Sequence, residues 1–466
     1  YADGTYNYHA MAGGIAGEGN SCYFYNCINS AFVAGKGKWL GGIASDIHLS
    51  RKSDRPTIVD CLNTGMVMAI SGDVVRALFN DYKLKYMPCH TRYYNGKEYT
   101  IRNLSNNQLN YVASEDYVGG MVGELWNGDI TRCANIGSIY SKGSPIGGIA
   151  AYFYQKCTVS DCLSDFECNA NNDIYSIVGK TDERCTISNC LNLTNRGIIK
   201  KPQDNSCSNN YTLRAGMNES YEKSVTKEQL ASGKTAIMLG DNWEQNLGTD
   251  TYPTPTGNRG LYHTRTVDEE FGTACLPYAL RSDDNISFFT FDKATGVSGD
   301  VELQFEYAET VPAGTPVLFV TEQLGEICIP DAKDGYSWEL PQITPNGKWQ
   351  MDGTFTGASF AGDDTKYIYY VANGNICNSE SVVIPPYRAF LHGPNVDRLI
   401  DADDTTPIME VRYLMASSGG DLGIKALDND ITPHNPSLTT FTLMGTKAPA
   451  GYKGIVIENG RKVVQR

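Results

Sequence analysis

The sequence predicts an all-β protein. We expect an N-terminal β-solenoid of about six rungs, a helical cap and connector, an antiparallel β-sandwich and a short β tail at the C-terminus. Three observations lead to this prediction. Two short phrases alternate through the first 195 residues, seven strand-like segments follow from residue 271, and the composition favours strands and turns, with 47 Gly, 29 Tyr and only 20% charged residues among 466.

Four segments follow from this pattern along the chain. We expect the solenoid at residues 1–222, the helical cap and linker at 223–268, the jelly-roll-like sandwich at 269–415 and the C-terminal tail at 416–466. This agrees with the two to four domains expected for a chain of this length.

The charge and the apolar segments argue against two classes of partner. A formal net charge of −14, from 39 basic and 53 acidic residues, repels phosphate backbones, so we expect no nucleic acid. No window approaches the ~18 consecutive apolar residues of a membrane helix, so we expect no transmembrane segment. The first residues, YADGTYNY, show neither an initiator Met nor a signal-peptide pattern. We interpret the chain as a soluble, processed or truncated product.

The first phrase of the repeat contains an anchor residue and ends two positions later in Asn or Ser. Its copies are CYFYNCIN (22–29), PTIVDCLN (56–63), YTIRNLSN (99–106), GDITRCAN (128–135), CTVSDCLS (157–164) and CTISNCLN (185–192), with anchors at Cys27, Cys61, Leu104, Cys133, Cys162 and Cys190. The last three anchor intervals are 29, 29 and 28 residues, and the longer earlier intervals place insertions near 47–56 and 78–98. We therefore expect one rung for each copy.

The second phrase is glycine-rich and alternates with the first. It reads GGIAG (13–17), GGIAS (41–45), GGMVG (119–123) and GGIAA (147–151), with SGDVV (71–75) and SIVGK (176–180) as degraded copies. A repeat of this length without helical apolar spacing is typical of stacked short strands. Stacking predicts an apolar column of Ile15, Ile43, Met121 and Ile149, and a polar column of Asn29, Asn63, Asn106, Asn135, Ser164 and Asn192.

Fourteen cysteines raise the question of metal or redox chemistry. Three pairs share the spacing C-x4-C, namely Cys22/Cys27, Cys157/Cys162 and Cys185/Cys190, whereas no CxxC motif occurs and no histidine recurs in step with the pairs. This spacing argues against zinc and thioredoxin-like sites. Two interpretations stay open, a ladder of buried thiols or disulfides within the pairs.

The alternation of GGIAG with NCINSAFVAG or DCLNTGMVMA resembles the GLUG-type repeats of surface proteins from Bacteroidetes-like and some Gram-positive bacteria. The resemblance covers about residues 10–195, and the rung at 71–106 departs from it. It implies a secreted or surface-displayed β-solenoid used for contact, and it supplies no catalytic residues.

One helix is predicted near residues 227–239. Thr226 and Gln229 form a T-x-x-Q capping box and Gly240 can end the helix, which we expect to cover the open end of the solenoid. The segment from KEQLASGKTAIML to NWEQNLGTDTYPTP resembles a connector that follows such repeats in large surface proteins of anaerobes. The prolines and glycines at 253–260 then predict a linker.

Seven strands are predicted in the second half, at 271–280, 286–294, 301–309, 316–323, 366–372, 382–392 and 408–415. The phrases FGTACLPYAL, VPAGTPVLFV and PPYRAFLH resemble a β-sandwich module of the same surface proteins. Trp338 and Trp349 lie in the long polar stretch between strands. These two indoles either stack on sugar rings, as a carbohydrate contact, or pack in the core.

The last segment predicts a hairpin. GIVIE and RKVV flank Asn459-Gly460, the dipeptide favoured in a type I′ turn. The segments GTKAP and KGIVIENGRKVV resemble the C-terminal tails of proteins exported by type IX secretion, which implies export across an outer membrane.

The search for chemistry finds no catalytic motif, so we predict no enzyme and no cofactor. The carboxylates Asp60, Asp129 and Asp161 are assigned to the position before the anchor, where a corner or a solvated role is expected. The acidic runs at 401–404 and 427–430 are read as solvated loops or calcium ligands.

The predicted function is a non-catalytic, extracellular contact protein at the cell surface, adhesive or structural. Its expected partners are surface glycans or proteins of host or bacterium, and further copies of itself through the solenoid edge. The alternatives are a glycan-binding or glycan-active accessory protein and a subunit of an extracellular filament.

Overall fold

The computed structural model of the chain describes residues 2–3, 11–48, 55–70, 87–106, 108–114, 117–169, 173–217, 219–258, 260–297, 300–340, 348–372, 375–377 and 381–394, with the strands at 409–414, 423–424, 440–442, 454–458 and 461–465. These residues form mostly β-strands and two short α-helices. The chain divides into two compact units, Tyr1–Leu261 and Tyr262–Arg466. The predicted copy at 71–75 and the acidic runs at 401–404 and 427–430 lie outside the described residues.

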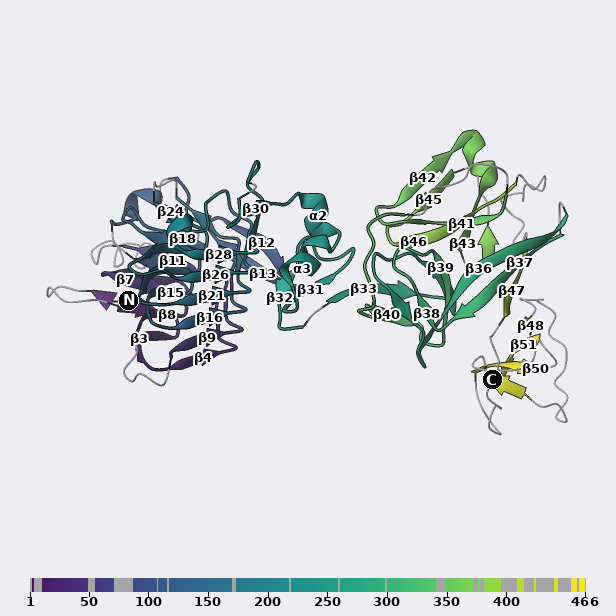
Figure 1. The fold of residues 1–466 in the computed structure, drawn as a ribbon, viewed down its shortest axis with the longest axis horizontal. Helices are drawn as coiled ribbons and strands as arrows, with labels where there is room; N and C mark the ends of the chain where they lie inside the picture. Colours follow the sequence, from purple (N-terminus) through teal and green to yellow (C-terminus); the bar gives the residue numbers. More distant parts are fainter. Residues whose placement is uncertain are drawn as a thin grey trace. The chain divides into compact units, whose positions relative to one another are not determined.

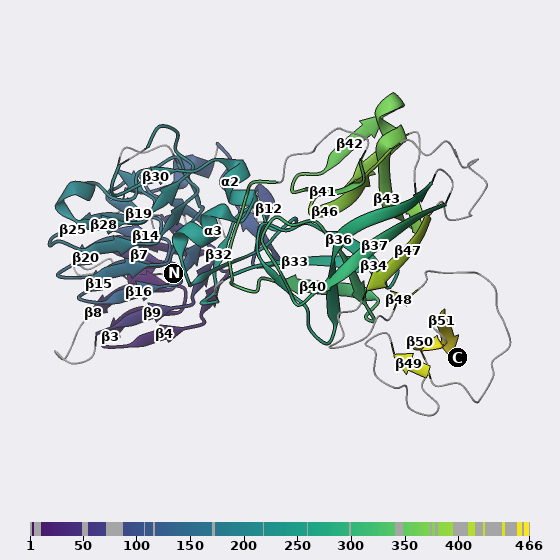
Figure 2. The same ribbon diagram turned by 45° about the vertical axis from the view of Figure 1, so that its right-hand side comes forward.

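The first unit contains five sheets of parallel strands, in which each strand pairs with the equivalent strand of the next repeat (Figures 1 and 2). Two sheets carry the glycine-rich phrase. The first consists of β2 (Met11–Gly13), β7 (Trp39–Gly41), β14 (Val118–Gly119), β19 (Ile146–Gly147) and β24 (Ile174–Tyr175). The second consists of β3 (Ala16–Asn20), β8 (Ala44–His48), β15 (Val122–Trp126), β20 (Ala150–Tyr154) and β25 (Val178–Thr181).

The other three parallel sheets carry the anchor phrase and the strand that follows it. The third consists of β4 (Tyr23–Tyr25), β9 (Thr57–Val59), β16 (Asp129–Thr131), β21 (Thr158–Ser160), β26 (Thr186–Ser188) and β28 (Ser206–Ser208). The fourth consists of β5 (Ile28–Asn29), β10 (Leu62–Asn63), β17 (Ala134–Asn135), β22 (Leu163–Ser164), β27 (Leu191–Asn192), β29 (Tyr211–Thr212) and β30 (Lys223–Ser224). The fifth consists of β1 (Ala2–Asp3), β6 (Val33–Lys36), β11 (Met66–Ala69), β18 (Ser138–Tyr140) and β23 (Glu167–Cys168).

The predicted apolar column is confirmed. Backbone hydrogen bonds of 2.8–3.0 Å run from the amide of each member to the carbonyl of the next, through Ile15, Ile43, Met121, Ile149 and Ile177. The last four members of this column, Ile43, Met121, Ile149 and Ile177, are fully buried, whereas Ile15 is 51% exposed. Neighbouring repeats therefore cover one another's apolar side chains, as the period requires.

The polar column is confirmed except at Asn106. Asn63 pairs in register with Asn29 on one side and with Asn135 on the other, so no strand from residues 99–106 lies between them. Instead, β12 (Cys89–Tyr94) and β13 (Lys97–Arg102) form an antiparallel hairpin, with the 3-10 turn Gln108–Tyr111 after it. The prediction of a rung anchored at Leu104 is wrong.

The parallel sheets also continue past the predicted last rung. β28 pairs with β26, and β29 pairs with β27, so residues 206–212 repeat the anchor phrase once more, after the 3-10 turn Pro202–Asp204. Asn210 takes the anchor position, where its side-chain carbonyl accepts a 3.0 Å hydrogen bond from the amide of Cys190. The prediction that the rungs stop after Asn195 is therefore wrong.

A left-handed corner precedes each anchor. It is formed by Asn26, Asp60, Arg132, Asp161, Asn189 and Asn209, whose φ angles lie between 51° and 55°. The corner role predicted for Asp60 and Asp161 is confirmed. The assignment of Asp129 to this position is wrong, because Asp129 lies in β16 and pairs with Thr57 and Thr158. Arg132 holds the corner instead, and its guanidinium donates two hydrogen bonds of 2.6 and 2.8 Å to the carboxylate of Asp60.

The cysteines of the stack are free thiols. Thirteen of the fourteen have side chains that the structure describes, and each of these is unpaired with another cysteine. Cys61, Cys133, Cys162 and Cys190 form the buried anchor column, each at most 1% exposed. Of the two interpretations of the C-x4-C pairs, the structure contains the thiol ladder.

The predicted helix is present in two pieces, α2 (Lys227–Ala231) and α3 (Lys234–Leu239). The capping box of Thr226 and Gln229 forms as predicted. Gly233 separates the helices with a φ of 82°, and a Cβ there would lie 2.8 Å from Leu261. Asn209, at the last corner of the stack, donates a 3.0 Å hydrogen bond to the carbonyl of Met238 in α3. This contact joins α3 to the corner at Asn209.

The segment predicted as a linker is instead ordered in strands. β31 (Trp243–Asn246) pairs with β32 (Thr254–Pro255), and Pro253, Thr254 and Pro255 are buried. The next strand, β33 (Gly260–Val267), pairs over residues 262–267 with β40 (Gly325–Pro330).

The second unit is built from sheets that are mainly antiparallel. One sheet follows the order β34 (Phe271–Ala274), β39 (Val317–Thr321), β36 (Ile286–Val297), β37 (Asp300–Ala308), β47 (Met409–Leu414) and β48 (Gly423–Ile424). Another follows the order β41 (Gln350–Thr354), β46 (Arg388–His392), β43 (Ile368–Ala372) and β44 (Asn375–Cys377). Smaller pairs are β35 (Leu280–Arg281) with β38 (Thr310–Val311) and β42 (Ala358–Ala361) with β45 (Ser381–Ile384), next to the 3-10 turn Gly362–Tyr367.

One hydrophobic cluster joins the two larger sheets of this unit. Phe289, Phe305 and Leu318 from the first sheet pack with Tyr369 and Leu391 from the second. A strand lies within each of the seven predicted segments. The segment 271–280 forms a strand only over Phe271–Ala274 before β35 begins at Leu280, and the segment 382–392 is split at its two prolines into β45 and β46. Strands β40, β41 and β42 lie outside the predicted segments.

The predicted C-terminal hairpin is confirmed. β50 (Gly454–Glu458) pairs antiparallel with β51 (Arg461–Gln465), and β49 (Thr440–Thr442) pairs with β50. Asn459 and Gly460 lie outside the described residues, as does the segment GTKAP.

Candidate functional site

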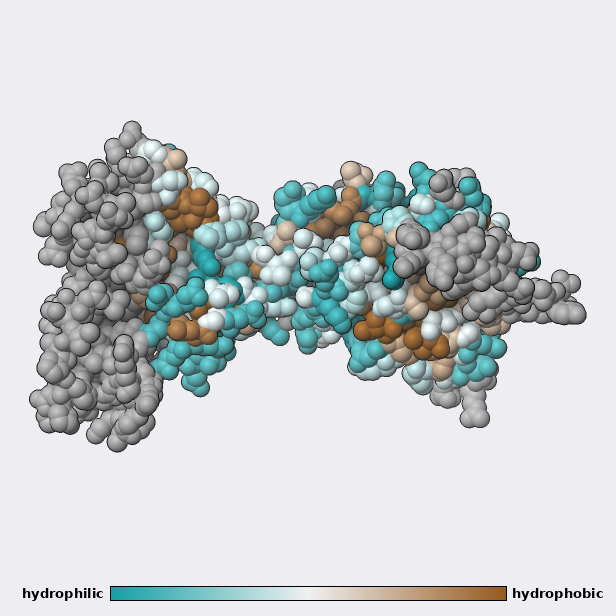
Figure 3. Space-filling model, turned by 180° about the vertical axis from the view of Figure 1, so that it is seen from behind, coloured by the Kyte–Doolittle hydropathy of each residue, from teal (hydrophilic) through white to brown (hydrophobic). Residues whose placement is uncertain are grey.

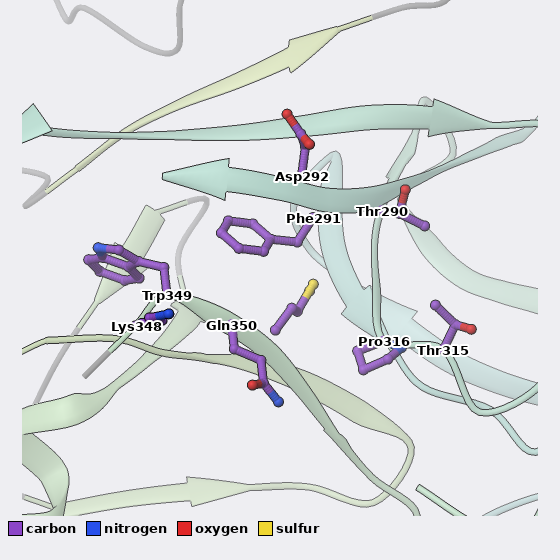
Figure 4. Close-up of a pocket in the computed structure, with 9 residues that line it drawn as sticks. Thr290, Phe291, Asp292, Thr315, Pro316, Lys348, Trp349 and Gln350 are labelled. Carbon is purple, nitrogen blue, oxygen red and sulfur yellow. The ribbon is translucent and has the colours of Figure 1, made fainter. Parts of the chain in front are cut away.

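A pocket of about 430 Å³ opens in the second unit beside Trp349 (Figure 4). Its lining comes from three separate parts of the chain, namely 290–292 in β36, 315–316 before β39, and 348–351 at the start of β41. These parts meet because the two larger sheets share one hydrophobic cluster. The pocket is therefore a product of sheet packing and not of a local motif.

The indole of Trp349 is held from behind and lines the pocket. Its ring lies 4.9 Å from the ring of Tyr369, with an angle of 40° between the planes. A Cβ on Gly393 would come within 2.5 Å of the indole, so only glycine fits there. Figure 4 shows the Phe291 ring on the same side of the pocket as the indole. Trp349 is thus half-buried: it packs against Tyr369 and it also lines the pocket.

Polar groups stand around these rings. Lys348 and Asp292 carry opposite charges at the pocket, and Thr290 adds a hydroxyl group. Gln350 donates a 2.6 Å hydrogen bond to Asp352, whose pKa is raised mainly by burial. An aromatic wall with neutral and balanced polar groups suits a ligand that has both an apolar face and hydroxyl groups.

Trp338 lies elsewhere in the second unit. Its ring stacks on the ring of Tyr336 at 6.1 Å and 15°, and Trp338 is not among the residues that line the Trp349 pocket. The hydroxyl of Tyr336 donates to Asp331 over 2.6 Å, which fixes the stack. The structure therefore does not bring the two predicted tryptophans into one site.

A second group of functional residue types lies in the first unit, where two carboxylates are buried side by side. Asp46 in β8 and Glu124 in β15 are direct neighbours in register, and they are only 1% and 3% exposed. Burial raises the pKa of each group to about 7, and mutual charge repulsion contributes for Glu124. The cost of burying two adjacent charges means that the pair retains a proton near neutral pH.

Aromatic side chains surround this pair. Glu124 is followed in the register by Tyr152, whose ring lies 4.8 Å from that of Tyr117. His48 places its Nε2 atom 2.8 Å from a carboxylate oxygen of Asp46 and contacts the ring of Trp126 edge-on at 4.8 Å. The two carboxylates are consequently shielded from solvent. A substrate in solution therefore has no direct access to them.

Sequence reasoning missed this pair, although a signal was present. Asp46 and Glu124 both stand three residues after the apolar residue of the glycine-rich phrase, Ile43 and Met121. Other copies of the phrase carry Glu18 and Tyr152 at the same position. Because a charged residue and an aromatic residue both occur there, the sequence position alone does not show that Asp46 and Glu124 are buried.

Two further features are absent from the described residues. Among them, no group of three or more His, Cys, Asp or Glu side chains is arranged to hold a metal ion. Within the same residues, no helix is both long and apolar enough to cross a membrane. On the face drawn in Figure 3, hydrophobic residues of the described part gather in small patches between hydrophilic ones.

Comparisons with protein-family models, with curated proteins and with solved structures found no match.

Proposed function

We propose that the chain is a non-catalytic, extracellular contact protein of a bacterial cell surface, and that its second unit binds carbohydrate at the Trp349 pocket. In this proposal the parallel sheets are the rungs of a GLUG-like β-solenoid, and the second unit is a β-sandwich. The in-register columns of Ile43 and Asn63 support the solenoid, and the cluster shared by two sheets supports the sandwich. The C-terminal hairpin supports the resemblance to a type IX tail.

The observation that carries the proposed function is the indole of Trp349 in a pocket with hydroxyl and balanced charged groups. A sugar ring presents an apolar face of C–H groups, which stacks on an aromatic ring, and hydroxyl groups at its edge, which hydrogen-bond to polar side chains. The volume of about 430 Å³ accommodates a short glycan segment. Tyr369 and Gly393 fix the indole before binding, which reduces the ordering entropy lost on association.

The buried pair has no catalytic role in this proposal. Asp46 and Glu124 are 1% and 3% exposed, so neither can approach a glycosidic bond without displacement of the aromatic residues around it.

The test is glycan-array binding of the full chain, with Trp349→Ala and Trp338→Ala as a matched pair of variants. Each removes one partly buried indole from the same unit. We expect Trp349→Ala to lose binding and Trp338→Ala to keep it. Binding that survives Trp349→Ala at full strength would remove the Trp349 pocket as the carbohydrate site. Polysaccharide turnover by the wild-type chain would contradict the non-catalytic role.

A further inference from the structure

The first repeat forms the edge of the parallel sheets in the first unit. Among the described strands, β4 pairs only with β9 and β5 pairs only with β10, and Figure 1 shows β4 at this edge. Four large apolar or aromatic side chains of this repeat are exposed, namely Ile15, Tyr23, Tyr25 and Ile28. Its anchor residue, Cys27, is half-buried, whereas the next anchor, Cys61, is 1% exposed. The described stack therefore holds the first repeat from one side only.

Cys27 and Cys61 occupy equivalent positions in neighbouring layers. The residues that follow them, Ile28 and Leu62, pair in register. Because parallel strands lie about 4.8 Å apart, the two Cα atoms fall within the range of ~4.4–6.8 Å that a disulfide spans. The backbone amide of Cys27 donates a 3.4 Å hydrogen bond to Sγ of Cys61. Only Cα and Cβ separate that amide nitrogen from Sγ of Cys27, so a rotation about χ1 of Cys27 brings the two sulfur atoms toward each other.

The two thiols also have the same orientation. Cys27 Sγ donates to the carbonyl of Tyr25 over 3.6 Å, and Cys61 Sγ donates to the carbonyl of Val59 over 3.2 Å. Tyr25 and Val59 are themselves partners in register. Thiol hydrogen bonds are weak, so the approach of the two sulfur atoms gives up little.

Access selects this pair from the cysteines of the stack. Five others are at most 2% exposed, so a reagent in solution does not reach them: Cys133, Cys157, Cys162, Cys185 and Cys190. Cys22 is half-buried in the first repeat, but the extended strand β4 separates it from Cys27. At about 3.3 Å per residue, their Cα atoms lie roughly 10 Å or more apart, beyond the ~7 Å limit for a disulfide.

We propose that Cys27 and Cys61 form a disulfide bond between the first and the second repeat, by exchange with a small disulfide such as oxidised glutathione. The thiolate of Cys27 attacks one sulfur of the small disulfide, which forms a mixed disulfide and releases one small thiol. Sγ of Cys61 then attacks Sγ of Cys27, and the second small thiol leaves. Two protein thiols are oxidised to one disulfide, the small disulfide is reduced to two thiols, and these take up the two protons.

Cys61 is the resolving thiol of this exchange. Its hydrogen bond with Cys133 and its burial raise the pKa of Cys61, so the second attack is the slower step. Cys61 is reached only through the mixed disulfide on Cys27, because its own side chain is buried. We therefore expect the mixed disulfide to appear before the cross-link.

The cross-link would fasten the edge of the stack. It joins residues 34 positions apart and so restricts the opened chain. The amides of Ile15 and Ala16 donate to the carbonyl of Ile43 over 2.9 and 3.1 Å, so opening of the first repeat exposes them to hydrogen exchange. Formation of the link in the cell rests on the oxidising surroundings of the proposed extracellular location. The chemistry itself does not depend on the Trp349 pocket.

The test incubates the reduced full chain with oxidised glutathione in the absence of denaturant. Acid stops the exchange, and mass spectrometry of peptides digested at acidic pH without reduction identifies the links. We expect one linked pair of peptides, Cys27 with Cys61, preceded by glutathione on Cys27. Exposed Cys89 and Cys328 have no cysteine opposite them in their strand pairs and should carry glutathione only.

Hydrogen exchange measures the consequence for the first repeat. The peptide that contains Ile15 and Ala16 should exchange at least about ten-fold more slowly in the cross-linked chain than in the reduced chain. Equal exchange in the two states would show that the link does not fasten this repeat.

Cys22→Ser is the matched control, because Cys22 is half-buried in the same repeat, and this variant should form the link as the wild type does. Cys61→Ala should stop at the mixed disulfide on Cys27, and Cys27→Ser should leave Cys61 as a thiol. If Cys61→Ala fails to fold, the peptide maps of the wild type and of Cys22→Ser decide.

Three outcomes overturn the proposal. Cys27 could be linked to Cys22, it could keep glutathione in the wild-type chain, or it could remain a thiol while Cys89 reacts. None of these readouts involves glycan binding, so this proposal and the carbohydrate site at Trp349 are judged separately.

Discussion

The side-chain amide of Asn29 donates a 2.8 Å hydrogen bond to the side-chain carbonyl of Asn63, 34 residues further along the chain. Asn63 in turn donates to the side-chain carbonyl of Asn135 over 2.9 Å. All three residues are at most 3% exposed. The asparagines therefore satisfy one another inside the stack, where an unpaired amide would be costly.

Removing the middle asparagine of this ladder should be strongly destabilising. Asn63→Ala leaves the amide of Asn29 without its acceptor, and we expect the free energy of unfolding to fall by about 2–4 kcal/mol. Chemical denaturation of the full chain, followed at the transition of the first unit, measures the change. Asn20→Ala, at an exposed position, should have little effect. Equal losses for the two variants would show that the ladder has no special role.

Native-state labelling should separate the thiols by burial. Cys89 and Cys328 are exposed, whereas Cys133, Cys162 and Cys190 are buried, and burial raises the pKa of the Cys162 thiol. We expect the exposed pair to react quickly and the anchor cysteines to react only after unfolding. Mass spectrometry of peptides from the alkylated native protein identifies them. Rapid reaction of Cys133 would show that the anchor column faces solvent.

Loss of one anchor side chain should cost stability through the cavity that it leaves. Cys133→Ala is expected to lower the free energy of unfolding by about 1–3 kcal/mol. Cys89→Ala, on the exposed hairpin, is the matched control and should be neutral. Thermal and urea unfolding measure both variants. A neutral Cys133→Ala would mean that neighbouring side chains close the space.

The left-handed corner can be tested at Asn189, where φ is 54°. Asn189→Gly and Asn189→Val both remove the amide side chain, but only valine is strained in this conformation. We expect Asn189→Val to be less stable than Asn189→Gly by about 1–2 kcal/mol. The comparison of their urea midpoints isolates the backbone effect. Equal midpoints would contradict a conformational requirement at the corner.

The buried carboxylates should make the first unit less stable as the pH rises. The pKa of Asp46 is raised from 3.8 to about 7, and that of Glu124 from 4.5 to about 7. Between these values the folded chain holds more protons than the unfolded chain, so the free energy of unfolding falls with increasing pH and the loss is complete above the folded pKa. At about 1.4 kcal/mol for each pKa unit, we expect the pair to contribute a decrease of about 4–8 kcal/mol between pH 4 and pH 8, the lower value applying if the two carboxylates share one proton.

The charges around the pair define the control for this measurement. Three charged or titratable residues interact with Asp46 or Glu124, namely Glu18 in β3, His48 in β8 and Lys38 just before β7. Asp46→Asn and Glu124→Gln should flatten the pH dependence of the melting temperature of the first unit, whereas Glu18→Gln, at an exposed position, should keep most of it. If Asp46→Asn shows the same slope as the wild type, the pair does not titrate in this range.

The apolar column and the asparagine column were predictable from the sequence, because the copies of a repeated phrase occupy equivalent positions in successive repeats. The rung at 99–106 failed because the pattern of YTIRNLSN also fits a hairpin strand, and apolar spacing alone does not choose between the two. The dipeptide Asn95-Gly96, with φ angles of 48° and 67°, was the signal for a hairpin turn. Past Asn195, the extra copy was hidden because Asn210 replaces the anchor cysteine.

The candidate sites were less predictable than the fold. Trp349 could be named from the sequence, but its pocket required Phe291 and Pro316, which only the packing of two sheets brings close. Burial of Asp46 and Glu124 likewise depends on aromatic residues from neighbouring repeats. Such contacts between distant segments leave no local pattern in one sequence.

Asn63 and Asn135 are bonded neighbours although 72 residues separate them, so the chain between them leaves the stack and returns in register. The ladder places no demand on the length or content of that excursion. An exchange of the hairpin would therefore keep the asparagine ladder but remove contacts that hold the hairpin to the parallel sheets, among them the hydrogen bond from the Ser138 hydroxyl to the carbonyl of Arg102. The length of the chain is thus free to vary at this point of the repeat, whereas the register of the strands on either side is not.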